Sequence, residues 1–237
     1  MFRFAVLITT NLRWCLKFRK MSKAVLEKPD APVEEKYEVA RAIASIIKEK
    51  GKVSEVVSYE DKLPESGYVM LANHEGRYDA LAIINNHEKP LSILIDNKKS
   101  NAPIEKDYID VLNCERIDKT NKRKSYESIK NIYHRVKNGE RFIIFPEGDF
   151  DKKKKNNLTD FYSGCLHFLK DNKTPIVPVC LYDTFRGLNQ FGKVTVEVHY
   201  LKPIYYEEYQ DLSYNDIALL VKERISRKLE EINKQNN

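Results

Sequence analysis

Residues 68–84 of this chain read YVMLANHEGRYDALAII: a short apolar run, a polar turn and an apolar pattern of helical spacing. The same plan is found on both sides of this stretch. It predicts strands at 52–59, 68–72, 91–95, 141–145, 174–181 and 194–200, and helices at 34–50, 79–84, 124–137, 161–169 and 215–234. Gly51 is expected to cap the first of these helices. Strands that alternate with helices indicate a single α/β domain, with a largely parallel central sheet flanked by helices.

The composition is that of one globular domain. Hydrophobic residues make up 42% of the 237 residues, which is enough for a sizeable core and argues against disorder. Four cysteines, Cys15, Cys114, Cys165 and Cys180, form no C-x-x-C pair, so we expect free buried thiols in a reducing compartment. The net charge of +6 suits an anionic bilayer, nucleic acid or phosphorylated substrate, but it is also ordinary for a soluble protein.

Residues 1–20 are apolar but interrupted by cations, so they do not predict a transmembrane helix. They lack a small-residue cleavage site, so they do not predict a secretory signal. On a helical wheel the apolar and basic side chains fall mostly on opposite sides. The apolar side holds Phe4, Ala5, Ile8, Leu12, Cys15, Leu16 and Phe18, and the basic side holds Arg3, Arg13, Lys17 and Lys20. Such a helix can lie among lipid headgroups or pack on the protein's own core. We expect residues 1–50 to form an amphipathic, membrane-contacting helical segment and residues 51–237 to form the α/β domain.

His74 and Asp79 lie where a predicted strand ends and a helix begins, which is where active sites of α/β folds collect. On one continuous helix, residues five apart point in different directions. At a strand-to-helix turn, however, the carboxylate can fold back onto the imidazole. It then fixes the tautomer and leaves the second ring nitrogen as a general base. Because the spacing is short and common, a purely structural pair is the alternative.

A second polar turn, Pro146-Glu147-Gly148, directly follows the predicted strand 141–145. Proline ends the strand, and glycine permits a tight turn with exposed N–H groups. The turn can present these donors and a carboxylate to a polar substrate, or it can simply be a good turn.

Taken together, these features resemble the glycerolipid acyltransferase family, which includes the 1-acylglycerol-3-phosphate acyltransferases, and in particular its short bacterial members. Four blocks match in order, between about Gly51 and Pro203. They are Ala72-Asn73-His74 to Asp79 (N-H-x4-D), Arg116-Ile117-Asp118-Lys119, Ile144-Phe145-Pro146-Glu147-Gly148, and Pro175-Ile176-Val177-Pro178-Val179.

The resemblance implies a role for each matching residue. His74 would deprotonate the acceptor hydroxyl, and Asp79 would orient the imidazole. Glu147, Gly148 and Asn73 would help to bind the substrate, and Lys119 with Arg116 would offer positive charge to a phosphate. Pro178 would shape the site or the acyl tunnel. No metal ligand is expected among them.

The resemblance also implies the reaction. A fatty acyl group would pass from acyl carrier protein or coenzyme A, as co-substrate, to a lysophospholipid, with 1-acylglycerol 3-phosphate as the first expectation. No metal or redox cofactor is implied. The enzyme would be monotopic or peripheral on the cytoplasmic face of the cell membrane. We expect no nucleic-acid partner, because no recognised binding module is present.

Two departures from the family pattern keep alternatives open. The third block usually continues Thr-Arg, but here it continues Asp149-Phe150. The second block usually ends in arginine, whereas Lys119 binds phosphate only as a point charge. A different lysolipid or a lipid alcohol could therefore be the acceptor. A catalytically silent lipid-binding relative is a further alternative. The basic run Lys152–Lys155 could supply the missing charge, or it could be a solvated loop.

Overall fold

The structure is a computed structural model of the chain, and it describes residues 12–101, 105–150 and 154–235. In these ranges the centre of the fold is a sheet of seven strands in the order β1-β7-β6-β2-β5-β3-β4. The strands are β1 (Val53–Tyr59), β2 (Tyr68–Ala72), β3 (Ser92–Asp96), β4 (Glu115–Ile117), β5 (Arg141–Ile144), β6 (Ile176–Tyr182) and β7 (Val194–Tyr200). All neighbours pair in parallel except β6 and β7, which are antiparallel. The predicted largely parallel sheet is confirmed.

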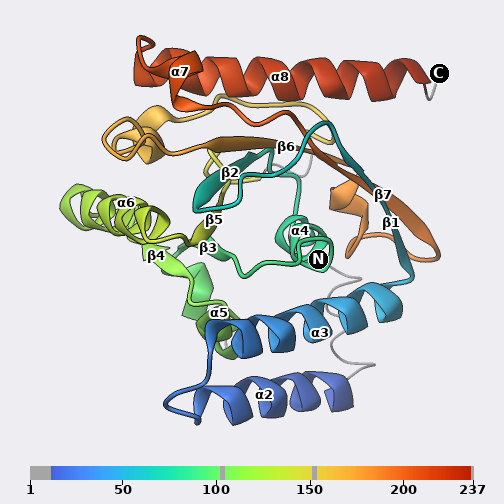
Figure 1. The fold of residues 1–237 in the computed structure, drawn as a ribbon. Helices are drawn as coiled ribbons and strands as arrows, with labels where there is room; N and C mark the ends of the chain where they lie inside the picture. Colours follow the sequence, from blue (N-terminus) through green and yellow to red (C-terminus); the bar gives the residue numbers. More distant parts are fainter. Residues whose placement is uncertain (1–11, 102–104, 151–153, 236–237) are drawn as a thin grey trace.

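Helices cover both faces of the sheet (Figure 1). The helices are α2 (Leu12–Leu26), α3 (Val33–Gly51), α4 (Asp79–Asn85), α5 (Lys106–Val111), α6 (Lys122–Lys137), α7 (Tyr206–Tyr209) and α8 (Tyr214–Gln235). Helices α2 to α5 lie on one side, whereas α6 and α8 pack on the core of the other. None of the helices formed by the described residues is long and apolar enough to cross a bilayer.

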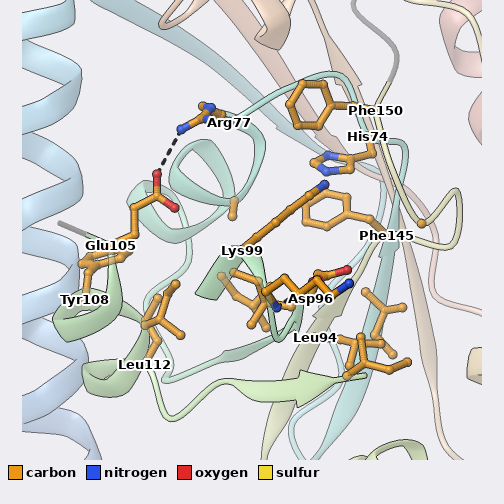
Figure 2. A pocket seen from close by; sticks show the side chains of 18 of the residues that line it. His74, Arg77, Leu94, Asp96, Lys99, Glu105, Tyr108, Leu112, Phe145 and Phe150 are labelled. Carbon is orange, nitrogen blue, oxygen red and sulfur yellow. Dashed lines mark hydrogen bonds and ion pairs between the residues drawn. The ribbon is translucent and has the colours of Figure 1, made fainter. Parts of the chain in front are cut away.

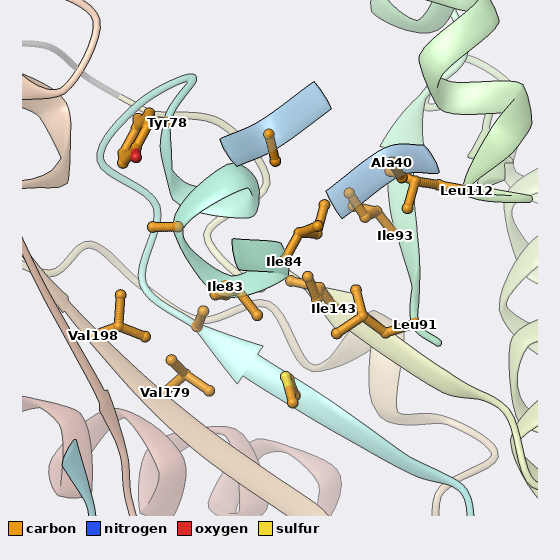
Figure 3. Packing of buried hydrophobic residues seen from close by; sticks show 14 of the residues in the cluster. Ala40, Tyr78, Ile83, Ile84, Leu91, Ile93, Leu112, Ile143, Val179 and Val198 are labelled. Carbon is orange, nitrogen blue, oxygen red and sulfur yellow. The ribbon is translucent and has the colours of Figure 1, made fainter. Parts of the chain in front are cut away.

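The central strand β2 is buried on both faces, as expected for a parallel sheet between two helical layers. Its side chains alternate between the two cores. Met70 packs in the core beneath α3 and α4, and Val69 and Leu71 pack in the core beneath α6 and α8. Figure 3 shows Ile83 and Ile84 of α4 in the first of these cores. This packing holds α4, and so its first residue Asp79, against the sheet.

Two local predictions are corrected, and some short elements were not predicted. Only Ser163–Leu166, a short 3-10 turn, is helical within the predicted helix 161–169. Gly51 is the last residue of α3, and Lys52 takes the left-handed cap conformation with a φ of 52°. The strand β4 and the helices α5 and α7 were not predicted, because each is too short to show periodicity.

The N-terminal helix begins the described chain at Leu12 and packs against α3 and α5. Residues 1–11, which carry much of the predicted amphipathic pattern, lie outside the described residues. Within α2 the predicted apolar side is divided, because Cys15 is buried while Leu12 and Leu16 are 57% and 58% exposed. Part of this side therefore packs on the protein, and part is free for another surface. The membrane-contacting role of residues 1–50 stays a prediction.

Candidate active site

Four parallel strands, β2, β3, β4 and β5, end at one edge of the sheet and bring their following loops together. His74 follows β2, Lys99 follows β3, Lys119 follows β4, and Gly148 follows β5. All four residues line one cavity of about 1,210 Å³. The cavity at this sheet edge therefore includes three of the predicted site residues, His74, Lys119 and Gly148.

The predicted contact between His74 and Asp79 is confirmed. The imidazole Nδ1 lies 2.8 Å from Asp79 Oδ2. The same oxygen accepts hydrogen bonds from the backbone N–H groups of Glu75 (2.6 Å) and Gly76 (2.9 Å). Asp79 is completely buried, whereas the His74 side chain is 18% exposed. The turn thus fixes the carboxylate, and the carboxylate fixes the imidazole.

Two aromatic rings hold the imidazole from other directions (Figure 2). Phe145 stacks on His74 with ring centroids 4.3 Å apart, and Phe150 meets its edge at 4.9 Å. Because Nδ1 faces Asp79, Nε2 is the nitrogen left to exchange a proton with a substrate. This is the arrangement of a positioned general base.

The cavity beside His74 is mostly apolar. Its walls are formed by aliphatic and aromatic side chains from α2, α3, α5, α6 and β3, including Phe18, Ile47, Ile93, Ile109 and Ile129. Such a lining suits a long hydrocarbon chain, because each methylene removed from water stabilises binding by roughly 0.8 kcal/mol.

Charged groups from the loops after β3, β4 and β5 meet beside His74. Lys119 Nζ donates to the Gly148 carbonyl at 2.8 Å and lies 3.3 Å from Asp149 Oδ2. Lys99 pairs with the other oxygen of Asp149. The hydrogen bond from Lys99 is the main reason why the pKa of Asp149 is lowered. The two lysines are thus bridged by a carboxylate at the position where the resemblance would place threonine.

Glu147 differs from its expected place in the cleft. Its side chain is 1% exposed and does not line the described cavity. Oε1 accepts from the His74 N–H at 2.9 Å, and Oε2 accepts from the Thr159 N–H at 2.8 Å and pairs with Lys154. Burial opposes ionisation, but these bonds, led by that of Lys154, lower the pKa of Glu147. Glu147 joins three chain segments, and its predicted substrate contact would need these bonds to open.

Replacing Glu147 with alanine is expected to lower the free energy of unfolding by about 2–3 kcal/mol, because buried donors and Lys154 lose their acceptor. Urea unfolding measures this change. Glu127→Ala, at an exposed position of α6, is the matched control. Equal stability of the two variants would contradict the structural role.

Three other predicted site residues also lie away from the described cavity. Asn73 bridges β2 to β6, because its amide both donates to and accepts from the backbone of Leu181, at 2.8 and 2.7 Å. Arg116 pairs with Asp110 and Ser100. Pro178 is buried in β6 beside Leu71 of β2. Their predicted substrate contacts are therefore indirect in this structure, whereas Lys119 and Gly148 do line the cavity.

Glu75, Lys99 and the aromatic neighbours of His74 were not predicted as site residues. Lys99 could have been found, since it closely follows a predicted strand whose end lies at the same sheet edge. Glu75 is only 7% exposed, and one of its oxygens lies 3.2 Å from the Thr184 hydroxyl. Burial, followed by the nearby charge of Asp79, raises the pKa of Glu75 to about 9. Its proximity to Thr184 gives no local sequence signal, because more than a hundred residues separate them.

A match to a known protein family identifies the family of this chain. The acyltransferase family model matches residues 55–182, which is more than half of the chain. The chain belongs to the acyltransferase family. This match spans both His74 and Glu147, and it confirms the family resemblance seen in the sequence blocks.

Relatives of this acyltransferase-family chain are known in yeast and bacteria. A 1-acyl-sn-glycerol-3-phosphate acyltransferase of Saccharomyces cerevisiae is 22% identical over 178 residues, covering 73% of this chain and 59% of the relative. The enzyme of the same name from Salmonella typhimurium is 24% identical over 170 residues, covering 70% of this chain and 69% of the relative. The chain thus spans about three-fifths of the yeast protein and about two-thirds of the bacterial one.

A solved structure has the same fold. The crystal structure of the 1-acyl-sn-glycerophosphate acyltransferase PlsC from Thermotoga maritima superimposes with a TM-score of 0.69. The alignment covers 96% of this chain and 98% of that protein at 18% sequence identity. The likeness confirms the predicted fold along nearly the whole chain.

Proposed function

We propose that this protein transfers a fatty acyl group from a thioester to the free hydroxyl of a lysophospholipid. The observation that carries the proposal is the His74–Asp79 pair, whose imidazole lines a large and mostly apolar cavity. The names of the yeast and Salmonella relatives support 1-acylglycerol 3-phosphate as the acceptor and phosphatidic acid as the product.

The geometry supports a direct transfer. His74 Nε2 takes the proton as the acceptor oxygen attacks the thioester carbonyl, and Asp79 stabilises the resulting imidazolium. The tetrahedral intermediate then collapses, the carbon–sulfur bond breaks, and the thiol leaves with the proton from Nε2. No acyl-enzyme forms, because the base acts on the acceptor itself.

The donor and the place of reaction are also proposals. Either acyl carrier protein or coenzyme A can present the thioester, since both carry it on an anionic, water-soluble molecule. Peripheral binding to the cytoplasmic leaflet is supported by α2, where the exposed Leu12 and Leu16 accompany Lys17, Lys20 and Lys23. Each cation near an anionic bilayer surface adds roughly 1 kcal/mol.

A second acceptor class is favoured by one observation. Asp149 already pairs with Lys99 and Lys119, and Phe150 packs against His74. A headgroup with little negative charge would leave these contacts intact, whereas a phosphate monoester has to compete with the carboxylate. A zwitterionic lysolipid or a lipid alcohol is therefore the alternative acceptor.

Acceptor and donor profiling tests the proposal. Thiol release by the purified protein is measured with acyl-coenzyme A and acyl carrier protein thioesters against lysophosphatidate, lysophosphatidylethanolamine and monoacylglycerol. Fastest turnover with lysophosphatidate supports the first acceptor. Turnover with only the other two supports the second acceptor. Thiol release with none of them contradicts the proposed function.

A further inference from the structure

The apolar cavity extends to both faces of the sheet. Some lining residues, Ile93, Ile109 and Leu112, belong to the core beneath α3 and α5. Others, Ile129 and Ile144, belong to the core beneath α6. We call the first part the α5 lobe, lined by Ile47, Ile93, Ile109 and Leu112. The second part is the α6 lobe, lined by Ile117, Tyr126, Ile129 and Phe168. His74 lines the same cavity as both lobes.

The two lobes differ in enclosure. In the α5 lobe, Ile93, Ile109 and Leu112 are at most 8% exposed. The α6 lobe has the buried Ile129 beside a more open wall, because Tyr126 is 52% exposed and its ring meets Phe168 at 5.0 Å. The total volume of about 1,210 Å³ exceeds the roughly 300–1,000 Å³ usual for a single small ligand. The cavity is therefore large enough for more than one chain.

Lysines line the cavity that His74 shares with the α6 lobe. Lys119 and Lys122 both line the cavity, and Lys122 begins the helix that also carries Tyr126 and Ile129. A Cβ on Gly148 would lie 3.8 Å from the Tyr162 ring and 3.9 Å from Lys119 Nζ, so cation and aromatic ring are neighbours. The His74 imidazole, these two cations and the apolar α6 lobe thus line one cavity.

We propose that the α6 lobe binds the acyl chain that the acceptor already carries. This inference rests on the proposed function and defines its acceptor as an amphiphile with one chain, an anionic group and a free hydroxyl. The hydroxyl lies at His74, the anionic group at Lys119, and the chain along Tyr126, Ile129 and Phe168. The enclosed α5 lobe then receives the donor chain, which arrives from a water-soluble carrier and needs complete shielding from water.

Gly164 offers a clean way to test the α6 lobe. It lines the cavity, is exposed, and has no heavy atom within 4 Å of where its Cβ would lie. Because Gly164 lies four residues before Phe168 of the α6 lobe and also lines the cavity, Gly164→Leu adds bulk on this side of the cavity without displacing the core. Ile47→Phe, on α3, is the matched variant for the α5 lobe.

The first readout is chain-length preference in turnover. Gly164→Leu is expected to raise KM for a long-chain lysophosphatidate about tenfold, because excluding even two methylenes costs roughly fourfold each. The same variant should affect glycerol 3-phosphate, which has no chain, far less and should leave the preferred donor length unchanged. Ile47→Phe should shorten the preferred donor chain without shifting the preferred acceptor length. If Gly164→Leu changes the donor preference instead, the assignment is overturned.

The second readout does not depend on turnover. Binding of a fluorescent-chain lysophosphatidate is measured below its micelle concentration. We expect binding to weaken about tenfold in Gly164→Leu and to change little in Ile47→Phe. Equal affinity of Gly164→Leu and the wild type overturns the proposal, even if no acceptor is turned over. Absence of turnover alone contradicts the proposed function. The binding result then still tests whether the α6 lobe holds the acceptor chain.

Discussion

Replacing His74 with alanine is expected to lower kcat for acyl transfer by about 10²–10⁴, which is the usual contribution of a positioned general base. The acceptor hydroxyl would lose its proton acceptor, while the cavity walls that bind the chains would remain. KM should therefore change much less than kcat. Thiol release under saturating donor and acceptor measures the effect.

The matched control is His134→Ala, at an exposed position on α6. It should retain wild-type turnover, and both variants should unfold at nearly the wild-type temperature. Wild-type turnover in His74→Ala would contradict the assignment of His74 as the base. A lowered melting temperature in His74→Ala alone would indicate instead that the Asp79 contact supports the fold.

The sequence predicted the contact between His74 and Asp79 because its signal is local. His74 and Asp79 lie on one strand-to-helix turn, and the backbone N–H groups of Glu75 and Gly76 complete the contact within that turn. The central strands were also predictable. Strand β2 was predicted with the residue bounds that the structure has, because both faces are buried and its apolar run is uninterrupted.

The positions of the remaining site side chains depend on contacts between segments that are far apart in the sequence. Glu147 and Asn73 lie beside residues that line the cavity, yet their side chains turn away from it to bind Thr159 and Leu181. A sequence motif identifies residues that belong to the site. It does not tell whether a side chain contacts the substrate or holds the surrounding loops together. The same limit applies to the lobes, which form only when α5 and α6 pack on opposite faces of the sheet.

Glu75 is expected to make the stability of the protein depend strongly on pH. Its pKa is raised to about 9 in the folded protein, first by burial and then by the charge of Asp79, from an ordinary value of 4.5. Between pH 5 and pH 8 the unfolded chain ionises this carboxyl while the folded chain keeps the proton. The unfolded state then binds fewer protons, so this group lowers the stability of the wild type as pH rises. The loss continues until the folded pKa near 9 is reached.

Replacing Glu75 with glutamine removes this fall in unfolding free energy with rising pH, because the amide does not titrate. Relative to the wild type, the variant should gain up to about 4 kcal/mol of unfolding free energy between pH 5 and pH 8, at roughly 1.4 kcal/mol per pH unit. Urea unfolding at several pH values measures the gain. The variant should also retain acyl transfer at neutral pH, because glutamine preserves the neutral, polar side chain beside Asp79 and Thr184.

Glu88→Gln serves as the matched control, since Glu88 is exposed on the same domain. It should show no pH-dependent gain. If Glu75→Gln gained nothing over this control, Glu75 would be ionised in the folded protein. In that case two carboxylates would lie buried together beside His74, and the second negative charge would stabilise the imidazolium. Loss of acyl transfer together with an unchanged pH slope would therefore identify Glu75 as a charged support of the base rather than a neutral one.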